Sequence, residues 1–455
     1  MAERLDRRGF LRLGGVATLA AAGLGLGCSS GSTQPARSAA KAATRGGQTL
    51  RIAQWGNFVP AYDQWFDSDF TKRWGEEHDV QVVVDHLPFA QLRNLADAEV
   101  AAGRGHDIFG FVLPSAVYED DVIDHREIIE EVEAKAGKMV AFVERSVLNP
   151  RTNKYFGVPD FWAASLVLYR VDLWEELGSG RRPDTWEELL RAGPGLKAMG
   201  HPLGIGISPD LDSALTLPAL LHAYGSSIQD EEGNLTINRP ATVEAVRMGA
   251  AIFQAGMTDE VFTWDGASDN RFLTSGRASL ILDPVSAMRA VEKQDPGLAG
   301  QIALAPIPQG PASRLGPHSV MNVNVIWRFS EHQELAKQFL VDHALNYREA
   351  FLRSEFYNLP AFPGTVPDVG ELLANDPVAQ AGDKYALLAD AGRWSTNHGH
   401  PGPTNAAIDE VVSQYLIPQM FAAAAKGEMT ATEAVAAAEA QMRPIFDKWR
   451  ERGKI

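Results

Sequence analysis

Residues 49–55 read TLRIAQW, residues 80–85 read VQVVVD and residues 106–112 read HDIFGFV. These short segments are rich in β-branched and aromatic residues and alternate in polarity, which is typical of strands. Between them, residues 62–78 and 88–102 place apolar side chains at helical spacing. The alternation of strands and helices predicts an α/β fold, in which a mainly parallel sheet is flanked by helices.

Helix start signals continue this pattern along the rest of the chain. A capping residue followed by Glu or Gln three positions later marks the start of a helix. Four such pairs are Asp172 with Glu175, Thr185 with Glu188, Ser330 with Gln333 and Thr430 with Glu433. In the first half, Trp65, Phe66, Phe70 and Trp74 recur at helical spacing, so we predict that they pack in the core.

The N-terminus carries a targeting pattern. Arg7-Arg-Gly-Phe-Leu-Arg12 precedes an uncharged Gly/Ala/Leu stretch and then Cys28, the single cysteine of the 455 residues. This order resembles a twin-arginine export signal that runs into a lipoprotein attachment cysteine. We therefore predict an export signal over residues 1–27, lipidation of Cys28 and a flexible tether over residues 28–47. The alternative is an N-terminal helix buried in the fold, for which the arginines have no evident use.

Charge and cysteine content restrict the class of protein. Without residues 1–27 the chain has 38 basic and 56 acidic residues, a net charge of −18. An acidic surface disfavours nucleic acid and anionic lipid, so the predicted membrane contact is the lipid anchor alone. No later segment approaches about 18 consecutive apolar residues, which predicts a soluble mature chain. Its length exceeds what one hydrophobic core usually serves, which indicates two lobes.

Four motifs in order resemble the extracellular solute-binding proteins of ABC importers, specifically the large sugar-binding branch related to maltose-binding proteins. The motifs are Tyr155-Phe-Gly-Val-Pro159 continuing through Leu168–Trp174 and Arg182–Leu189; Phe272–Leu280; Ala303–Gly310 with Ser319–Trp327 and Glu334–Leu340; and Gly399-His-Pro-Gly-Pro403. The resemblance covers roughly residues 48–450. Arg170 departs from the family pattern, in which Tyr or Asn is commoner at that position.

The resemblance implies a two-lobed periplasmic-binding-protein-like fold in which the chain crosses between the lobes three times. The N-terminal lobe would combine residues 48–158 with 308–344. The C-terminal lobe would combine residues 159–307 with 345–455. A cleft between two such lobes is the natural ligand site, because ligands of open α/β sheets bind at the carboxyl ends of the strands.

A saccharide requires flat aromatic surfaces together with carboxylates or amides that accept hydroxyl protons. The chain has ten tryptophans, and polar residues stand beside several of them at predicted strand ends and in polar loops. The predicted ligand-binding residues are Trp55, Asn57, Ser115, Asp160, Trp162, Trp264, Asp265, Asp283, Trp394 and His400. For each the alternative is a structural role: sheet core for Trp55, a surface turn for Asp265 and helix capping for Asp283.

The sequence is thus interpreted as a lipid-anchored, exported and monomeric receptor, which captures a saccharide or polyol by hinge closure and delivers it to the permease of an ABC importer. No enzyme activity, cofactor or metal is predicted, because the histidine pair His398 and His400 lacks the partners of a zinc site. Two alternatives remain open. One is a secreted carbohydrate-active hydrolase that uses paired carboxylates among Asp160, Asp265 and Asp283. The other is a tethered ligand sensor of the same fold.

Overall fold

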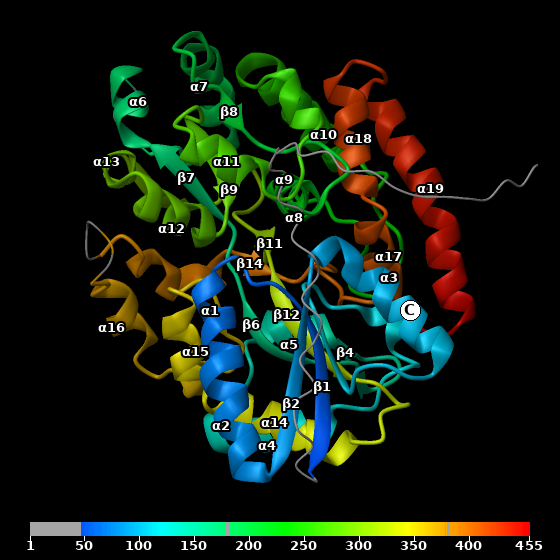
Figure 1. The fold of residues 1–455 in the computed structure, drawn as a ribbon. Coiled ribbons are helices and arrows are strands. Elements are labelled where there is room, and N and C mark those ends of the chain that lie inside the picture. Colours follow the sequence, from blue (N-terminus) through cyan, green and yellow to red (C-terminus); the bar gives the residue numbers. More distant parts are fainter. Residues whose placement is uncertain (1–46, 179–181, 378, 380–382) are drawn as a thin grey trace, which may run out of the picture. The chain divides into compact units, whose positions relative to one another are not determined.

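A six-stranded sheet organises one part of the fold (Figure 1). Its order is β13 (Leu359–Pro360), β6 (Val158–Trp162), β12 (Met321–Ile326), β3 (Ile108–Phe111), β1 (Gln48–Trp55) and β2 (Val80–Leu87). Strand β1 pairs in parallel with β2 and β3, as the first segments of the sequence predict. Strand β12 pairs antiparallel with β3 and β6, and β13 pairs antiparallel with β6. The antiparallel pairs occur where the chain returns from the second sheet.

The computed structural model describes residues 47–178, 182–377, 379 and 383–455. The predicted export signal, Cys28 and all of the predicted tether except residue 47 lie outside the described residues. Among the described residues, none of the helices combines the length and apolar character that crossing a membrane requires.

A four-stranded sheet organises the other part. Its order is β10 (Ile302–Pro306), β7 (Leu166–Arg170), β9 (Leu280–Asp283) and β8 (Leu203–Gly204). Strands β8 and β9 are parallel, whereas β7 runs antiparallel to both β9 and β10. Two further ladders are short: β11 (Gly316–Pro317) with β14 (Ser395–Thr396), and β4 (Leu148–Asn149) with β5 (Lys154–Tyr155). Both main sheets are therefore mixed, and the fold is α/β as predicted.

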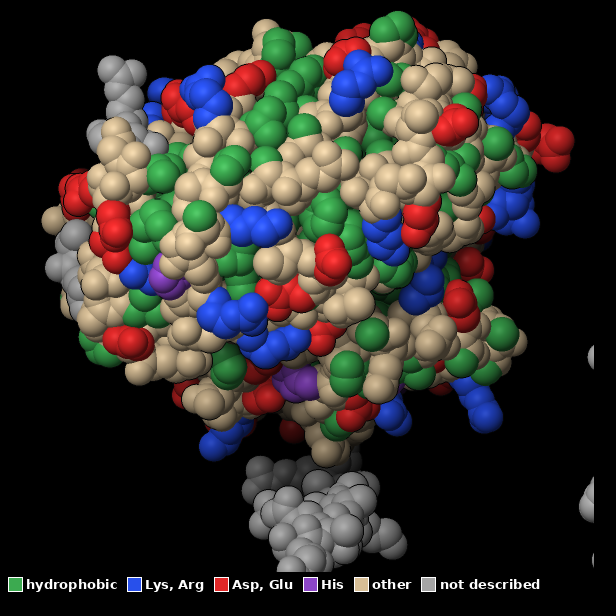
Figure 2. Space-filling view, turned by 90° about the horizontal axis from the view of Figure 1, so that it is seen from above, with side chains coloured by type: hydrophobic (Ala, Val, Ile, Leu, Met, Phe, Trp, Pro, Cys, Tyr) green, Lys and Arg blue, Asp and Glu red, His purple; other side chains and the backbone are tan. Residues whose placement is uncertain are grey.

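Helices flank both main sheets (Figure 1). Those around the six-stranded sheet are α1 (Pro60–Trp65), α2 (Thr71–His78), α3 (Phe89–Ala102), α4 (Arg126–Ala136), α5 (Ala141–Val147), α14 (Gln333–Leu345) and α15 (Tyr347–Arg353). Those around the four-stranded sheet and beyond it are α6 (Val171–Glu176), α7 (Trp186–Ala198), α8 (Leu211–Thr216), α9 (Pro218–Ala223), α10 (Pro240–Gly256), α11 (Ser268–Thr274), α12 (Val285–Gln294), α13 (Pro296–Ala299), α16 (Val369–Ala374), α17 (Ala406–Ser413), α18 (Leu416–Ala425) and α19 (Ala431–Glu451). Figure 2 shows the face formed by helices over the four-stranded sheet, where acidic and basic side chains are interspersed.

The helix signals of the sequence are confirmed in two of four cases. Thr185 caps α7 and Thr430 caps α19, each in a reciprocal capping box with the Glu three residues later. Helix α6 instead begins after Arg170, and α14 begins after His332. The prediction that Trp65, Phe66, Phe70 and Trp74 pack in the core is also confirmed, because all four side chains are buried.

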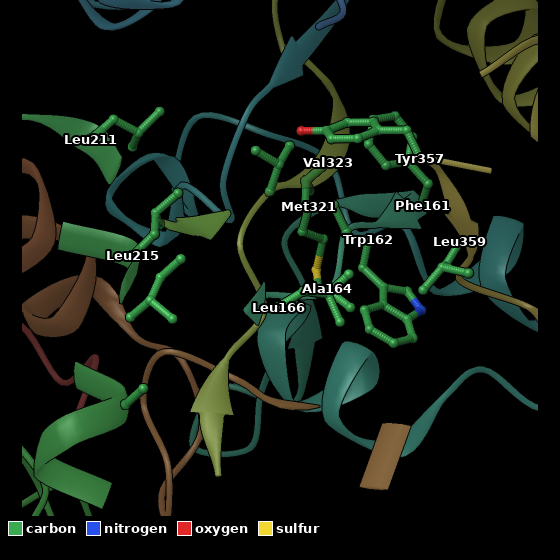
Figure 3. Packing of buried hydrophobic residues seen from close by; sticks show 14 of the residues in the cluster. Phe161, Trp162, Ala164, Leu166, Leu211, Leu215, Met321, Val323, Tyr357 and Leu359 are labelled. Carbon is green, nitrogen blue, oxygen red and sulfur yellow. The ribbon is translucent and has the colours of Figure 1, made fainter. Parts of the chain in front are cut away.

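The chain passes from β6 to β7 through the buried segment 163–165. The peptide N–H of Ala163 donates to the carbonyl of Val320 at 2.7 Å, and that of Ser319 donates to the carbonyl of Ala163 at 2.9 Å. Two connections between the sheets are thus hydrogen-bonded to each other. Figure 3 shows this region, with Ala164 and Leu166 continuing from Phe161 and Trp162. The lobe boundaries stay predictions, although the pairing of Leu359–Pro360 with β6 favours a last crossing later than residue 344.

Arg289 of α12 links the four-stranded sheet to the segment that precedes β13. Its buried guanidinium lies 2.6 Å from an oxygen of Asp376 and 2.9 Å from an oxygen of Glu292. The same group donates to the backbone carbonyl of Glu355 at 3.0 Å and lies 3.8 Å from the ring centroid of Tyr385. Removing the guanidinium would leave two buried carboxylates without their cation.

We expect Arg289→Met to lower the free energy of unfolding by about 3–5 kcal/mol, the usual cost of an uncompensated buried charge. Chemical denaturation monitored by circular dichroism measures this change. Arg353→Met is the matched control, because Arg353 pairs with Glu349 on the surface of α15. The control is expected to change the unfolding free energy by less than about 1 kcal/mol. Equal effects of the two substitutions would contradict the structural role of Arg289.

Candidate functional site

A small cavity lies where the two main sheets meet, and we call it the carboxylate cavity. It is lined by Phe58, Ser319, Val320 and Tyr357 from segments next to strands of the six-stranded sheet, and by Leu211, Asp212, Gly266, Asn270, Asp283, Pro284 and Ser286 from segments around the four-stranded sheet. Phe58 follows the carboxyl end of β1, and Asp283 is the last residue of β9. Carboxyl ends of strands are where ligands of α/β sheets bind. The volume of about 10 Å³ has room for about one water molecule.

Three carboxylates gather at this cavity. Oxygens of Asp212, Asp269 and Asp283 lie within 4.8 Å of one another. Asp212 lies in the first turn of α8, Asp269 lies in the first turn of α11, and Asp283 lies one residue before Pro284, the N-cap of α12. Asp269 accepts a hydrogen bond from the peptide N–H of Asn270 at 2.7 Å. Three helix starts therefore bring like charges together from segments 71 residues apart in sequence.

Burial and mutual repulsion raise the pKa values of the carboxyl groups in this cluster. Burial raises the pKa of Asp212 well above its usual value, and the neighbouring Asp269 and Asp283 raise it further. Burial likewise raises the pKa of Asp283, with Asp269 adding to the effect. Burial raises the pKa of Asp269 as well, against hydrogen bonds that favour its ionised form. Buried like charges disfavour full ionisation, so the cluster is neutralised by shared protons or by a cation.

Aromatic rings face the carboxylates from the other side of the cavity. The ring centroid of Phe58 lies 5.6 Å from that of Trp55, 6.3 Å from that of Phe89 and 6.3 Å from that of Tyr357. Tyr357 is buried, and its hydroxyl has no hydrogen-bond partner. Figure 3 shows this hydroxyl pointing away from Leu359, toward the side on which Leu211 lies. The buried side-chain oxygen of Asn270 is also unpartnered, so the cavity offers polar atoms that the protein itself leaves unsatisfied.

A second and larger pocket adjoins the first through Leu211, which lines both. Its volume is about 260 Å³, and we call it the arginine pocket. Arg93 of α3 and Asp409 of α17 form an ion pair in its wall. Burial raises the pKa of Asp409, and the Arg93 guanidinium opposes that rise. The two pockets together form a cleft between segments associated with the two sheets.

Of the predicted site residues, two line this cleft. Asp283 lines the carboxylate cavity and Ser115 lines the arginine pocket. Trp55 lies behind Phe58 and is 3% exposed. Asn57 accepts from the peptide N–H of Val59 at 2.8 Å, which fixes the turn that carries Phe58. Trp55 and Asn57 therefore support the aromatic wall.

Asp160 lies in a buried polar chain behind the cavity. It accepts from the amide of Asn322 at 2.9 Å, and that amide accepts from the indole N–H of Trp55 at 2.8 Å. The second oxygen of Asp160 has no hydrogen bond and lies 3.6 Å from Nδ1 of His343. Burial raises the pKa of Asp160 to about 7 and lowers the pKa of His343 to about 4. Both groups are thus neutral over a common pH range.

The other predicted residues lie outside the lining of both pockets. Trp162 packs against Phe142, because adjacent residues of a strand face opposite sides of the sheet and Phe161 takes the cavity side. The indole of Trp394 donates to the carbonyl of Ser165 at 3.1 Å, which ties it to the crossing segment. As ligand contacts, both residues stay predictions.

The remaining three predicted site residues lie in two loops, one just before α11 and the other the Gly/Pro-rich loop at residues 399–403. Trp264 packs on Phe272 with ring centroids 5.3 Å apart. Asp265 is exposed and pairs with Arg271 at 2.7 Å, which lowers its pKa. His400 packs against His222 with ring centroids 5.2 Å apart.

The sequence interpretation did not name Phe58, Asp212 and Tyr357, which line the carboxylate cavity, or Asp269, which lies beside it. One signal was present for Asp212, because Asp210-Leu-Asp212 precedes an apolar run in the manner of a helix start. Asp269 precedes the motif at Phe272 by only three residues. No local signal distinguishes Tyr357, which reaches the cavity through the tertiary fold.

Comparisons with known proteins identify the family. Residues 58–353 match the model of the family described as bacterial extracellular solute-binding protein. Relatives from Brucella abortus are 23% identical over 211 residues, so the match spans about half of this chain and half the length of these curated relatives. The arabinooligosaccharide-binding protein of Bacillus subtilis is 24% identical over 324 residues, which cover 67% of this chain and 71% of that protein.

The fold agrees with solved structures. Maltose-bound MalE3 of T. maritima superposes with a TM-score of 0.71 at 19% sequence identity, over 87% of this chain and 99% of that chain. At this level of identity the likeness concerns the fold. The predicted periplasmic-binding-protein-like fold, with its two lobes, is thereby confirmed.

Because Asp160 is buried, we expect it to make the free energy of unfolding of the protein decrease as the pH rises. Its pKa in the folded state lies above the value of an unfolded Asp, so the folded state binds more protons between about pH 4 and pH 7. Stability from this group is therefore present at low pH and is lost as the pH rises through about 7. Asp160→Asn keeps the acceptor for Asn322 but removes the charge.

We expect the free energy of unfolding of Asp160→Asn, relative to the unmodified protein, to rise by about 1–3 kcal/mol between pH 5 and pH 8. Urea denaturation at a series of pH values measures this difference. Asp265→Asn is the control, because the lowered pKa of Asp265 predicts no such rise over this range. A pH-independent difference for Asp160→Asn would contradict the burial of an ionisable carboxyl at this position.

Proposed function

Because this chain belongs to the bacterial extracellular solute-binding proteins, we propose that it captures a saccharide or polyol in the cleft between its two sheets and delivers it to the membrane permease of an ABC importer. The observation that carries the proposal is the carboxylate cavity, where acidic groups face aromatic rings across the junction of the sheets. A saccharide presents hydroxyl donors at its edge and an apolar face on its ring, and the cavity offers a partner for each.

The mechanism that fits this geometry is hinge closure. The carboxylate cavity is too small for a sugar ring in the present arrangement, so the two walls must separate to admit a ligand. Crossing segments that are hydrogen-bonded to each other, such as those at Ala163 and Val320, can guide such a motion. A ligand that contacts both walls would shift the population toward the closed form.

The arrangement of the carboxylates favours binding over hydrolysis. Glycosidases place two carboxyl groups on opposite sides of the scissile bond, about 5–9.5 Å apart. Here Asp212 and Asp283 line the cavity and Asp269 lies beside them, and oxygens of the three carboxylates are within 4.8 Å of one another. Asp160 lies in the polar chain behind the cavity, and Asp265 pairs with Arg271 in an exposed loop. These positions support binding of a saccharide rather than its cleavage.

Binding is expected to be detectable by intrinsic tryptophan fluorescence of the mature protein against a panel of saccharides and polyols. Trp55 touches Phe58, so a ligand on the aromatic wall should alter the emission. We expect Phe58→Ala to weaken the affinity by about 10-fold or more, since it removes one aromatic face of the site.

Val412→Ala, in the wall of the larger pocket, is the control for loss of an apolar side chain and should change the affinity less. The recovered saccharide should be chemically unchanged after incubation. Release of new reducing ends would contradict a binding protein. Binding that is indifferent to Phe58→Ala would place the ligand elsewhere.

The proposal includes export and a lipid anchor at Cys28. In a host with twin-arginine export, we expect the protein to fractionate with the membrane and to be released by Cys28→Ser. Arg7→Lys with Arg8→Lys should retain it inside the cell. Immunoblots of cell fractions measure both outcomes, and membrane association of Cys28→Ser would contradict anchoring through the cysteine.

A further inference from the structure

Within the described part of the chain, the acidic wall of the carboxylate cavity has no cationic partner. No Lys, Arg or His lines the cavity among the described residues. In the same part of the chain, Asp212, Asp269 and Asp283 take part in no ion pair with a basic side chain. The nearest basic residue in sequence, Arg271, pairs outward with Asp265. Such a cluster is an incomplete electrostatic unit, because buried carboxylates are normally paired.

A primary ammonium group is compatible with the spacing of these carboxylates. An ammonium nitrogen about 2.8 Å from three oxygens, with its N–H bonds at tetrahedral angles, holds those oxygens about 4.6 Å apart. The three carboxylates place oxygens within 4.8 Å of one another. The group also has three N–H donors, one for each carboxylate. A neutral sugar hydroxyl has only one hydrogen-bond donor, and its binding does not neutralise the negative charge of the carboxylates.

We propose that Asp212, Asp269 and Asp283 bind the protonated amino group of the ligand, and that the ligand class is an amino-bearing saccharide. This inference rests on the proposed function, and it names the substrate class of the same site. Two unsatisfied buried atoms, the Tyr357 hydroxyl and the side-chain oxygen of Asn270, lie at the same cavity and are free to bind hydroxyl groups next to the amine.

The aromatic wall favours an organic cation over a metal ion. Phe58 and Tyr357 line the cavity opposite the acidic wall. Aromatic faces stabilise an ammonium group and the C–H bonds of a sugar ring. A hard divalent cation instead requires about six oxygen ligands around it. On the aromatic side of this cavity, Phe58 supplies no oxygen and Tyr357 supplies one hydroxyl.

The test is isothermal titration calorimetry of the mature protein with the disaccharide of β-1,4-linked glucosamine and with its N-acetylated counterpart. Acetylation removes the charge of each amino group and adds an acetyl group to it. We expect the charged disaccharide to bind about 100-fold more tightly, as for a desolvated charge pair. The preference should fall to about 10-fold or less in Asp283→Asn.

Asp265→Asn is the matched control, because this exposed carboxylate lies in the loop just before α11, the helix that carries Asp269, but outside the cavity. It should keep the full preference. Thermal melts in the absence of ligand check folding, and Asp283→Asn should not melt below the unmodified protein, since it relieves repulsion in the cluster.

The outcomes separate this inference from the proposed function. Equal binding of the charged and the acetylated disaccharide, or of a neutral saccharide in their place, would overturn the amine site while leaving saccharide capture intact. A melting shift produced by calcium alone and reversed by a chelator, without binding of the amine, would assign the cluster to a metal ion. Failure of every saccharide in the panel to bind would remove both proposals.

Discussion

The fold depends on how the chain passes between its two sheets without leaving buried backbone groups unsatisfied. At the crossing, Ala163 accepts from Ser319 and donates to Val320, so each connection provides the hydrogen bonds that the other needs. This arrangement allows two connections to run through the interior rather than over the surface. It also fixes the position of the cleft, because Ser319 and Val320 line the carboxylate cavity directly beside the crossing. The site is therefore located where relative motion of the sheets changes it most.

The same dry junction explains why the acidic cluster is costly. Carboxylates that lie close together in a low-dielectric region repel each other far more strongly than in water. Each member of the cluster begins or precedes a helix, where free peptide N–H groups favour a negative charge. Peptide N–H groups stabilise the ionised forms of Asp269 and Asp283 but do not remove the repulsion among the three carboxylates. A local cost of this kind is typical of a functional site, where stability is given up for recognition.

The sequence predicted the features that local patterns determine. The strands over residues 49–55 and 80–85 are found because their alternation is complete within each segment. Asp283 was singled out from the end of a predicted strand, a placement that is visible locally, and it lines the carboxylate cavity as the last residue of β9. Asp212 and Tyr357 were missed because more than 140 residues separate them in sequence, and only the tertiary fold brings them to one cavity. The sequence does not show which side of a strand a tryptophan faces, and in the structure Trp55 packs on Phe161 while Trp162 packs on Phe142.

The aromatic wall and the acidic wall of the cavity would contribute differently to ligand selectivity when the cleft closes. A ligand shifts an open and closed equilibrium only by the difference in its affinity for the two forms. A neutral molecule that touches only the aromatic wall gains the same contact in both forms. A molecule that also neutralises Asp212, Asp269 and Asp283 relieves their repulsion. That relief is largest when water is excluded by the opposite wall. Under the proposed mechanism, charge on the ligand and closure of the cleft reinforce each other, so one electrostatic interaction would serve both selectivity and conformational change.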